Sequence, residues 1–281
     1  MWDVLTSHFT ALYYRDQTWI SDLRGGLNWR IMLFMSMNKG KIAKGGKAVY
    51  GAAVGILMLE ARFPRIPGDM GNALSWPFPV HYKVVRGASP DLVVRRRAEN
   101  MLTPFIDAAR ELVADGVDGI TTNCGFLSLF QAELAAAVPV PVMTSSLMQW
   151  DMVARLMPHG RRPGILTINA SSLSPDHLTA AGVPLDAPIV TTEGRRAFTR
   201  AILDNEPEMD IDLARADNIE AAVELASDPT IGGIILECTN MIPYAADIRA
   251  ATGLPVYSIY NLVIWFQASL RPPRFPSHED S

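Results

Sequence analysis

The residues of this 281-residue sequence best suited to chemistry are two cysteines, Cys124 and Cys238. Each follows a short apolar run typical of a buried strand and precedes a segment with helical patterning. In parallel α/β sheets, ligands bind at the carboxyl ends of the strands, where the following helices begin. A thiol in that position meets the positive end of a helix dipole, which can lower its pKa below the usual value of about 8.5. We therefore predict that both cysteines act as acid–base groups near neutral pH.

The pairing of two thiols indicates proton transfer at a carbon centre. Inverting such a centre without a cofactor requires one group that removes a proton from one face and another that delivers a proton to the opposite face. Cys124 and Cys238 would meet this requirement if two facing lobes each supplied one of them. Fixed hydrogen-bond donors must stabilise the enolate that develops. The expected donors and substrate contacts flank the cysteines and are Asn123, Gly125, Thr239 and Asn240.

Three further polar residues are candidates for substrate binding. Thr144 and Ser145 end the strand that follows the first cysteine helix, where their hydroxyls would reach the cleft. Asn72 lies in a Pro- and Gly-containing loop after the first strand, and with Arg65 and Asp69 it would form one wall of the pocket. For Thr144 and Ser145, as for the asparagines beside the cysteines, the alternative role is helix capping.

The two halves of the sequence can be laid on each other. Thr-Thr-Asn-Cys124 is followed by a helical segment and by Val-Pro-Val-Pro-Val142, and Leu-Glu-Cys238 is followed by a helical segment and by Gly-Leu-Pro-Val256. Such an internal repeat predicts an α/β fold of two similar lobes. Each lobe would hold a parallel sheet flanked by helices, and an approximate twofold axis would relate the lobes, with the active site in the cleft between them.

The alternation of apolar runs and helical periodicity places the elements. Strands are expected at 52–59, 80–85, 117–122, 140–144, 163–168, 189–192, 233–237 and 255–258. Helices are expected at 91–114, 126–137, 146–157, 211–227, 241–251 and 262–270.

The expected domain organisation follows from these elements. Residues 48–158 form the first lobe and 159–259 the second, with a helix over 260–272 that packs back on the first lobe. Residues 1–47 are expected to be a poorly packed extension and linker, with Met35 or Met37 as the natural start, and 273–281 a tail.

Composition excludes several classes of protein. A formal net charge of -4 provides no general electrostatic field for nucleic acid. The expected ligand is instead a small-molecule carboxylate, held by local groups. Neither a secretory leader nor an apolar run of the roughly 20 residues that span a membrane is recognisable. We therefore expect a cytoplasmic protein, with reduced thiols, no membrane association and the possibility of a homodimer.

The residue types also argue against a cofactor. The cysteines form no CxxC or Cys/His cluster with the spacing of metal ligands, so no metal is expected. A pyridoxal phosphate enzyme needs a lysine inside its pocket. All lysines precede residue 84, and only Lys83 lies outside the Gly-rich linker and its surroundings. We therefore predict a cofactor-independent enzyme.

The motifs Thr-Asn-Cys124-Gly and Glu-Cys238-Thr-Asn resemble those of the aspartate/glutamate/hydantoin racemase superfamily, over about residues 50–270. The resemblance implies that Cys124 and Cys238 are the paired acid and base, and that Asn123, Thr239 and Asn240 contact the substrate. The chain departs from glutamate racemases in the loop after the first strand, which lacks their Asp-Ser pair, and in having Glu237 where glycine is common. It therefore resembles a separate branch of the superfamily.

The function predicted on these grounds is an isomerase, a racemase or epimerase of an amino acid or related carboxylate. The alternatives within the same cleft are a decarboxylase of the arylmalonate type, which needs one cysteine, and a maleate-type cis/trans isomerase. A regulatory module that binds a carboxylate without chemistry is the alternative outside enzymes.

Overall fold

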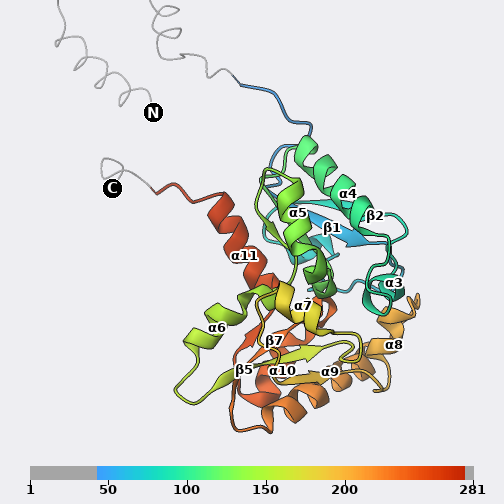
Figure 1. The fold of residues 1–281 in the computed structure, drawn as a ribbon, viewed down its shortest axis with the longest axis vertical. Coiled ribbons are helices and arrows are strands. Elements are labelled where there is room, and N and C mark those ends of the chain that lie inside the picture. The colour runs from blue at the N-terminus through green and yellow to red at the C-terminus, as the bar shows by residue number, and fades with distance from the viewer. Residues whose placement is uncertain (1–42, 276–281) are drawn as a thin grey trace, which may run out of the picture. The chain divides into compact units, whose positions relative to one another are not determined.

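The computed structural model describes residues 43–275. Its internal contacts divide the chain into Met1–Gly46 and Lys47–Ser281, and the fold lies in the second unit (Figure 1). Most of the predicted N-terminal extension, including Met35 and Met37, and the end of the predicted tail lie outside the described residues.

Two four-stranded parallel sheets form the two lobes. The first has the order β2-β1-β3-β4 and the second has the order β6-β5-β7-β8, which is the same topology one repeat later. The prediction of two similar parallel α/β lobes is therefore confirmed. The strands are β1 (Val54–Leu59), β2 (Val80–Val85), β3 (Gly119–Thr122), β4 (Val142–Met143), β5 (Arg162–Thr167), β6 (Ile189–Thr191), β7 (Ile231–Leu236) and β8 (Val256–Tyr257).

The central strands are apolar because helices cover both faces of their sheets. Every residue of β1, with sequence Val-Gly-Ile-Leu-Met-Leu, is buried, which is typical of parallel sheets. The α-helices are α3 (Pro90–Val94), α4 (Leu102–Asp115), α5 (Gln131–Ala137), α6 (Trp150–Leu156), α7 (Pro175–Ala180), α8 (Phe198–Leu203), α9 (Ile211–Ala226), α10 (Ala245–Thr252) and α11 (Ile259–Leu270). Among the described residues, no helix combines the length and apolar character needed to cross a membrane.

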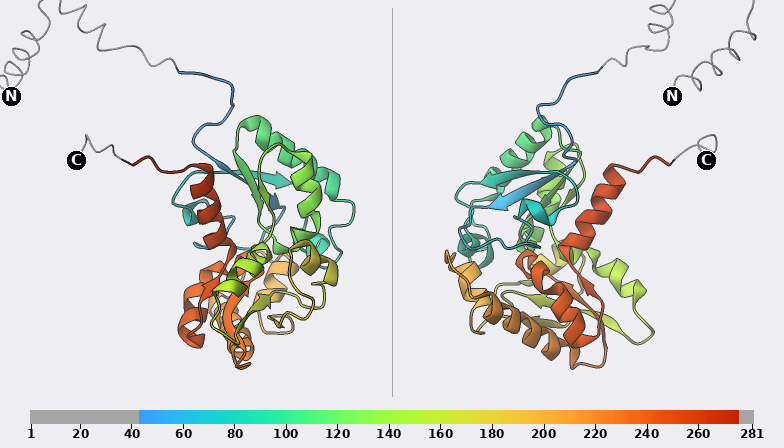
Figure 2. Two further views of the ribbon diagram at one scale, coloured as in Figure 1. Left: turned by 60° about the vertical axis from the view of Figure 1, so that its left-hand side comes forward. Right: turned by 180° about the vertical axis from the view of Figure 1, so that it is seen from behind.

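Helix α11 packs against the first lobe although it follows the second in sequence (Figure 2). Leu262, Val263 and Phe266 belong to the apolar cluster that also contains Val54 and Ile56 of β1. Gly119 of β3 permits this contact, since a Cβ atom there would lie 2.6 Å from the ring of Phe266. The last helix thus lies directly on the sheet that carries Cys124.

The single helix predicted over 91–114 is wrong. Helices α3 and α4 are separate, and Arg97, Ala98 and Asn100 between them have positive φ angles, which no continuous α-helix allows. The connecting loop reaches the second lobe, where Arg95 pairs with Asp204 at 2.7 Å. The sequence analysis also missed α7 and α8, which are only six residues long each.

Candidate active site

Each cysteine stands where a core strand gives way to a 3-10 turn. Cys124 precedes η2 (Gly125–Phe130), and Cys238 precedes η4 (Thr239–Tyr244). Helices α5 and α10 follow these turns, so the helices predicted at 126–137 and 241–251 each begin as 3-10 structure. The cysteines thus occupy equivalent positions in the two lobes, with β3 ending at Thr122 and β7 at Leu236.

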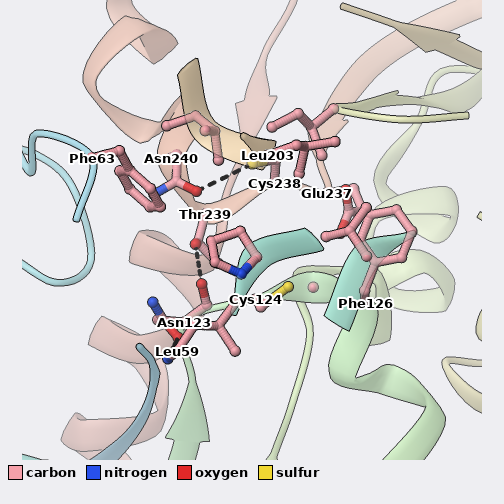
Figure 3. Close-up of a pocket in the computed structure, with 15 residues that line it drawn as sticks. Leu59, Phe63, Asn123, Cys124, Phe126, Leu203, Glu237, Cys238, Thr239 and Asn240 are labelled. Carbon is pink, nitrogen blue, oxygen red and sulfur yellow. Dashed lines mark hydrogen bonds between the residues drawn. The ribbon is translucent and has the colours of Figure 1, made fainter. Parts of the chain in front are cut away.

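Both cysteines line one small cavity between the lobes (Figure 3). Both thiols are free, and the residues are only 8% and 6% exposed. Figure 3 shows Glu237 and Phe126 on one side of the two cysteines and Phe63 and Asn240 on the other. The remaining lining is Leu59, Pro90, Val94, Asn123, Gly125, Ile168, Ile202, Leu203 and Thr239.

The cavity encloses about 20 Å³. This volume holds about one water molecule, so a substrate of several heavy atoms enters only if the lobes separate. Among the described residues that line the cavity, none carries a positive charge. Across residues 43–275, no group of three His, Cys, Asp or Glu side chains is arranged to hold a metal ion.

The prediction that the helix dipoles lower the thiol pKa values is wrong. Burial, with a smaller contribution from the nearby Glu237 carboxylate, raises the pKa of Cys124 to about 12. Burial likewise raises the pKa of Cys238 well above its usual value, again with Glu237 contributing. The loss of hydration outweighs the dipole of a short 3-10 turn, because a buried charge is expensive unless it is paired.

The two thiols nevertheless have different neighbours. Backbone N–H groups of Phe126 and Leu127 lower the pKa of Cys124, and so does the positive charge of Arg65, although burial dominates. The Cys238 thiol donates a hydrogen bond to Asn240 Oδ1, with a sulfur–oxygen distance of 3.6 Å. The backbone N–H of Asn240 lowers the pKa of Cys238 in the same way. Two N–H groups thus favour the Cys124 thiolate, whereas Cys238 has one such donor and donates its own hydrogen to Asn240.

A chain of polar side chains fixes Asn240 from behind the cavity. Asn240 Nδ2 donates to Asp69 Oδ2 at 2.6 Å, and Arg65 Nη1 donates to Asp69 Oδ1 at 2.8 Å. Arg65 Nη2 is buried and has no hydrogen-bond partner within the described part of the chain. Arg65 and Asp69, which the sequence suggested as pocket wall, therefore lie one layer behind the lining and orient Asn240.

Glu237 is the site residue that the sequence analysis did not select. Its side chain is fully buried, and Oε2 accepts a hydrogen bond of 2.8 Å from the Thr167 hydroxyl. Burial raises the pKa of Glu237 to about 7. The available signal was its position, an acidic residue at the end of a buried strand and directly before a candidate catalytic cysteine.

The structure brings four of the predicted substrate contacts, Asn123, Gly125, Thr239 and Asn240, to the cavity. The Asn123 side chain also has a structural role, since its Oδ1 accepts a hydrogen bond of 2.8 Å from the Leu59 N–H. The Thr239 hydroxyl donates to the Asn123 carbonyl oxygen at 2.5 Å, which ties the second lobe to the first beside the thiols. Contact of these residues with substrate stays a prediction.

Three other candidates, Thr144, Ser145 and Asn72, lie outside the cavity lining. The Thr144 hydroxyl donates to Gln131 Oε1 at 2.8 Å. Ser145 and Asn72 cap 3-10 turns, accepting hydrogen bonds from backbone N–H groups two residues ahead. Their polar groups are thus used by the backbone and by neighbouring side chains, and for Ser145 this is the helix-capping role that the sequence offered as the alternative.

Comparison with solved structures gives the class of the fold. An arylmalonate decarboxylase matches with a TM-score of 0.51 and 15% identity, over 79% of this chain and 93% of its own. A glutamate racemase from Bacillus anthracis matches with a TM-score of 0.52 and 14% identity, over 78% and 82%. No family model matches the sequence. The two-lobed fold is that of arylmalonate decarboxylase and glutamate racemase.

Sequence relatives define the family more narrowly. A dimethylsulfoniopropionate lyase from Durusdinium sp. clade D is 30% identical over 233 residues, which are 80% of this chain and 77% of the relative. Dimethylsulfoniopropionate lyase 3 of Emiliania huxleyi is 31% identical over 236 residues, but the match spans only 61% of that longer protein. The chain belongs to the dimethylsulfoniopropionate lyase family. Its relatives in both comparisons are enzymes.

Proposed function

We propose that this protein is a lyase that cleaves dimethylsulfoniopropionate by removing a proton from the carbon next to its carboxylate. The observation that carries the proposal is the pair of buried thiols, Cys124 and Cys238, on one cavity in a member of this family. Racemisation and this elimination begin with the same step, since both withdraw the proton α to a carboxylate. They differ in the fate of the carbanion, which is either reprotonated or loses a group from the β carbon.

The elimination balances without a cofactor or a second proton donor. The Cα–H bond breaks and its proton passes to the base. Its electron pair forms the double bond between Cα and Cβ, and the bond from Cβ to the positive sulfur breaks with its electrons going to sulfur. The products are acrylate and neutral dimethyl sulfide, so the leaving group takes up no proton.

Cys124 is the base in this scheme. The Phe126 and Leu127 N–H groups favour its thiolate, and a bound sulfonium cation adds a positive charge to a cavity whose described lining residues have none. The substrate thus helps to ionise the thiol that attacks its proton. The Cys238 thiol, held by Asn240, orients the substrate and moves no proton during elimination.

Cysteine-to-serine variants test these roles. We expect Cys124→Ser to lower kcat/KM for dimethyl sulfide release by at least about 100-fold, because a positioned base contributes about 10²–10⁴-fold. We expect Cys238→Ser to lower it by no more than about tenfold, because the serine hydroxyl can still donate to Asn240 Oδ1 and no proton transfer is lost. Headspace gas chromatography of dimethyl sulfide measures both, and circular dichroism checks folding. Equal losses in the two variants would contradict the assignment of a single base.

Racemisation is the second candidate, because both thiols line the cavity and occupy equivalent positions in the two lobes. A two-base racemase requires both thiols, whichever enantiomer it receives. Incubation with single enantiomers of amino acids in heavy water would then show α-deuterium incorporation, and both serine variants would lose racemisation. The elimination proposal predicts no such incorporation into amino acids.

A further inference from the structure

Glu237 presents a carboxylate oxygen that no other group in the described part of the chain satisfies. The residue is fully buried, and Thr167 occupies Oε2, but Oε1 has no hydrogen-bond partner among residues 43–275. A Cβ atom added to Gly125, the neighbour of Cys124, would lie 2.2 Å from Oε1. The free oxygen therefore lies against the backbone next to one thiol, while the chain continues from Glu237 directly into the other.

The surroundings of this carboxylate offer no compensating charge. The rest of the lining is mostly apolar, with Phe63, Phe126, Ile202 and Leu203 among the residues of the cavity, and no described lining residue is Lys or Arg. An ionised carboxylate in such a place is strongly disfavoured unless a cation joins it. Burial accordingly raises the pKa of Glu237 to about 7, so that near neutral pH the group ionises readily once a cation arrives.

We propose that Glu237 is the counter-ion for the positive group of the substrate and that it selects a sulfonium or other fully alkylated cation. The inference rests on the proposed function, since it assigns one residue to one end of dimethylsulfoniopropionate. The carboxylate end would then lie away from Glu237, toward Asn240 and the Arg65 guanidinium behind it.

The chemistry of the lining favours an alkylated cation over an ammonium group. A primary ammonium carries three N–H donors and needs an acceptor for each when it leaves water. A sulfonium carries none, so one carboxylate oxygen and apolar or aromatic walls are sufficient. The cavity offers Glu237 Oε1 beside Phe126, which meets the needs of a sulfonium group but not those of a primary ammonium group.

Three carboxylates that differ in the charge and hydrogen bonding of one end test the proposal. The probes are 3-(trimethylammonio)propanoate, its neutral isostere 4,4-dimethylpentanoate and the ammonium compound 3-aminopropanoate. Calorimetry at a pH of about 8 measures their affinities for wild type, Glu237→Gln and Glu133→Gln. The last variant is the matched control, because Glu133 is exposed on α5 and outside the cavity.

We expect wild type and Glu133→Gln to bind the trimethylammonio compound at least about tenfold more tightly than either other probe. In Glu237→Gln the preference over the neutral isostere should fall to near unity, while the affinity for the isostere itself changes little. The inference is overturned if wild type binds the trimethylammonio compound no better than its neutral isostere. It is also overturned if Glu237→Gln keeps the same preference for the cation over the isostere.

Release of dimethyl sulfide by wild type is measured in parallel and separates the two claims. Sulfide release together with an unchanged cation preference in Glu237→Gln contradicts the role of Glu237 and leaves the lyase proposal standing. A cation preference that depends on Glu237, in a protein that releases no sulfide, supports the counter-ion and contradicts the proposed reaction.

Discussion

Cys124 and Cys238 hold matching positions in the two lobes, but their hydrogen-bond partners differ and suit them to different roles. Two backbone N–H groups favour the thiolate of Cys124, whereas Cys238 has one such donor and itself donates to Asn240 Oδ1. In a racemase each thiol must act as a base for one enantiomer, so a lasting asymmetry is a disadvantage. An elimination needs one base, and the asymmetry of this site suits that reaction.

The pH dependence of catalysis follows from Glu237. Its pKa is raised to about 7, so the carboxyl is neutral below that value and becomes a counter-ion above it. The other titratable groups of the cavity, Cys124 and Cys238, have pKa values raised far above neutrality. We expect kcat/KM for dimethylsulfoniopropionate to rise from pH about 6 to 8 with Glu237 ionisation, and to continue rising in alkali as Cys124 ionises.

The dependence of kcat/KM on pH is measured by stopping the reaction at intervals and quantifying acrylate, from pH about 6 into the alkaline range. In Glu237→Gln the rise centred near neutrality should disappear while the alkaline rise remains. A profile in the variant that still rises through neutrality would assign that ionisation to another group.

The residues of the site were predictable to different degrees. The internal repeat and the strand ends locate both cysteines and the four polar neighbours that line the cavity, because strand–turn–helix patterning is local in sequence. The importance of Glu237 depends on its complete burial and its unpaired oxygen, which arise only when the lobes meet. The raised thiol pKa values have the same origin, since desolvation is a property of the assembled cavity.

The 3-10 turns that follow the cysteines determine how closely the two lobes approach each other at the site. Gly125 begins η2, and its lack of a side chain lets the Glu237 carboxylate and carbonyl pack against the first lobe. Sequence periodicity predicted α-helices here, because 3-10 and α segments bury similar positions over a single turn. Periodicity also could not show the break between α3 and α4, which depends on three residues with positive φ.

A methyl group at position 125 tests this packing. In Gly125→Ala the new Cβ would lie 2.2 Å from Glu237 Oε1 and 2.4 Å from the Glu237 carbonyl oxygen. We expect a loss of about 1–3 kcal/mol in the free energy of unfolding, measured by urea denaturation. The control is Gly45→Ala, where no atom of the described residues lies within 4 Å of the added Cβ. If both variants are equally stable, the close approach of the lobes at Gly125 is incorrect.

At the scale of the whole molecule, the fold couples access to the thiols with separation of its lobes. Hydrogen bonds cross between the lobes beside the site, from Thr239 to Asn123 and from Ser146 to the Leu236 carbonyl oxygen at 2.6 Å. Two exposed ion pairs join the lobes at the rim of their interface, Arg97 with Asp176 and Arg95 with Asp204, each at 2.7 Å. Because the enclosed space is about 20 Å³, we expect reagents to reach the cysteines only when the lobes separate.

Removing the rim ion pairs should speed this opening. We expect the double variant Asp176→Asn/Asp204→Asn to react several-fold faster with a thiol-alkylating reagent, as followed by mass spectrometry. Its stability should change little, since exposed ion pairs contribute about 0–1 kcal/mol each. The matched control is Asp186→Asn, which removes an exposed pair with Arg162 inside the second lobe. An equal acceleration in the control would show that the rim does not govern access.

The central claim, that the protein withdraws an α-proton and expels a sulfide, is tested most directly by proton NMR of the wild-type reaction in heavy water. With dimethylsulfoniopropionate as substrate, we predict acrylate and dimethyl sulfide in equal amounts. We also predict a primary isotope effect on product formation when the α carbon of the substrate carries deuterium. Formation of both products should be lost in Cys124→Ser. Recovery of unchanged substrate, or of α-deuterated substrate without acrylate, would contradict the account.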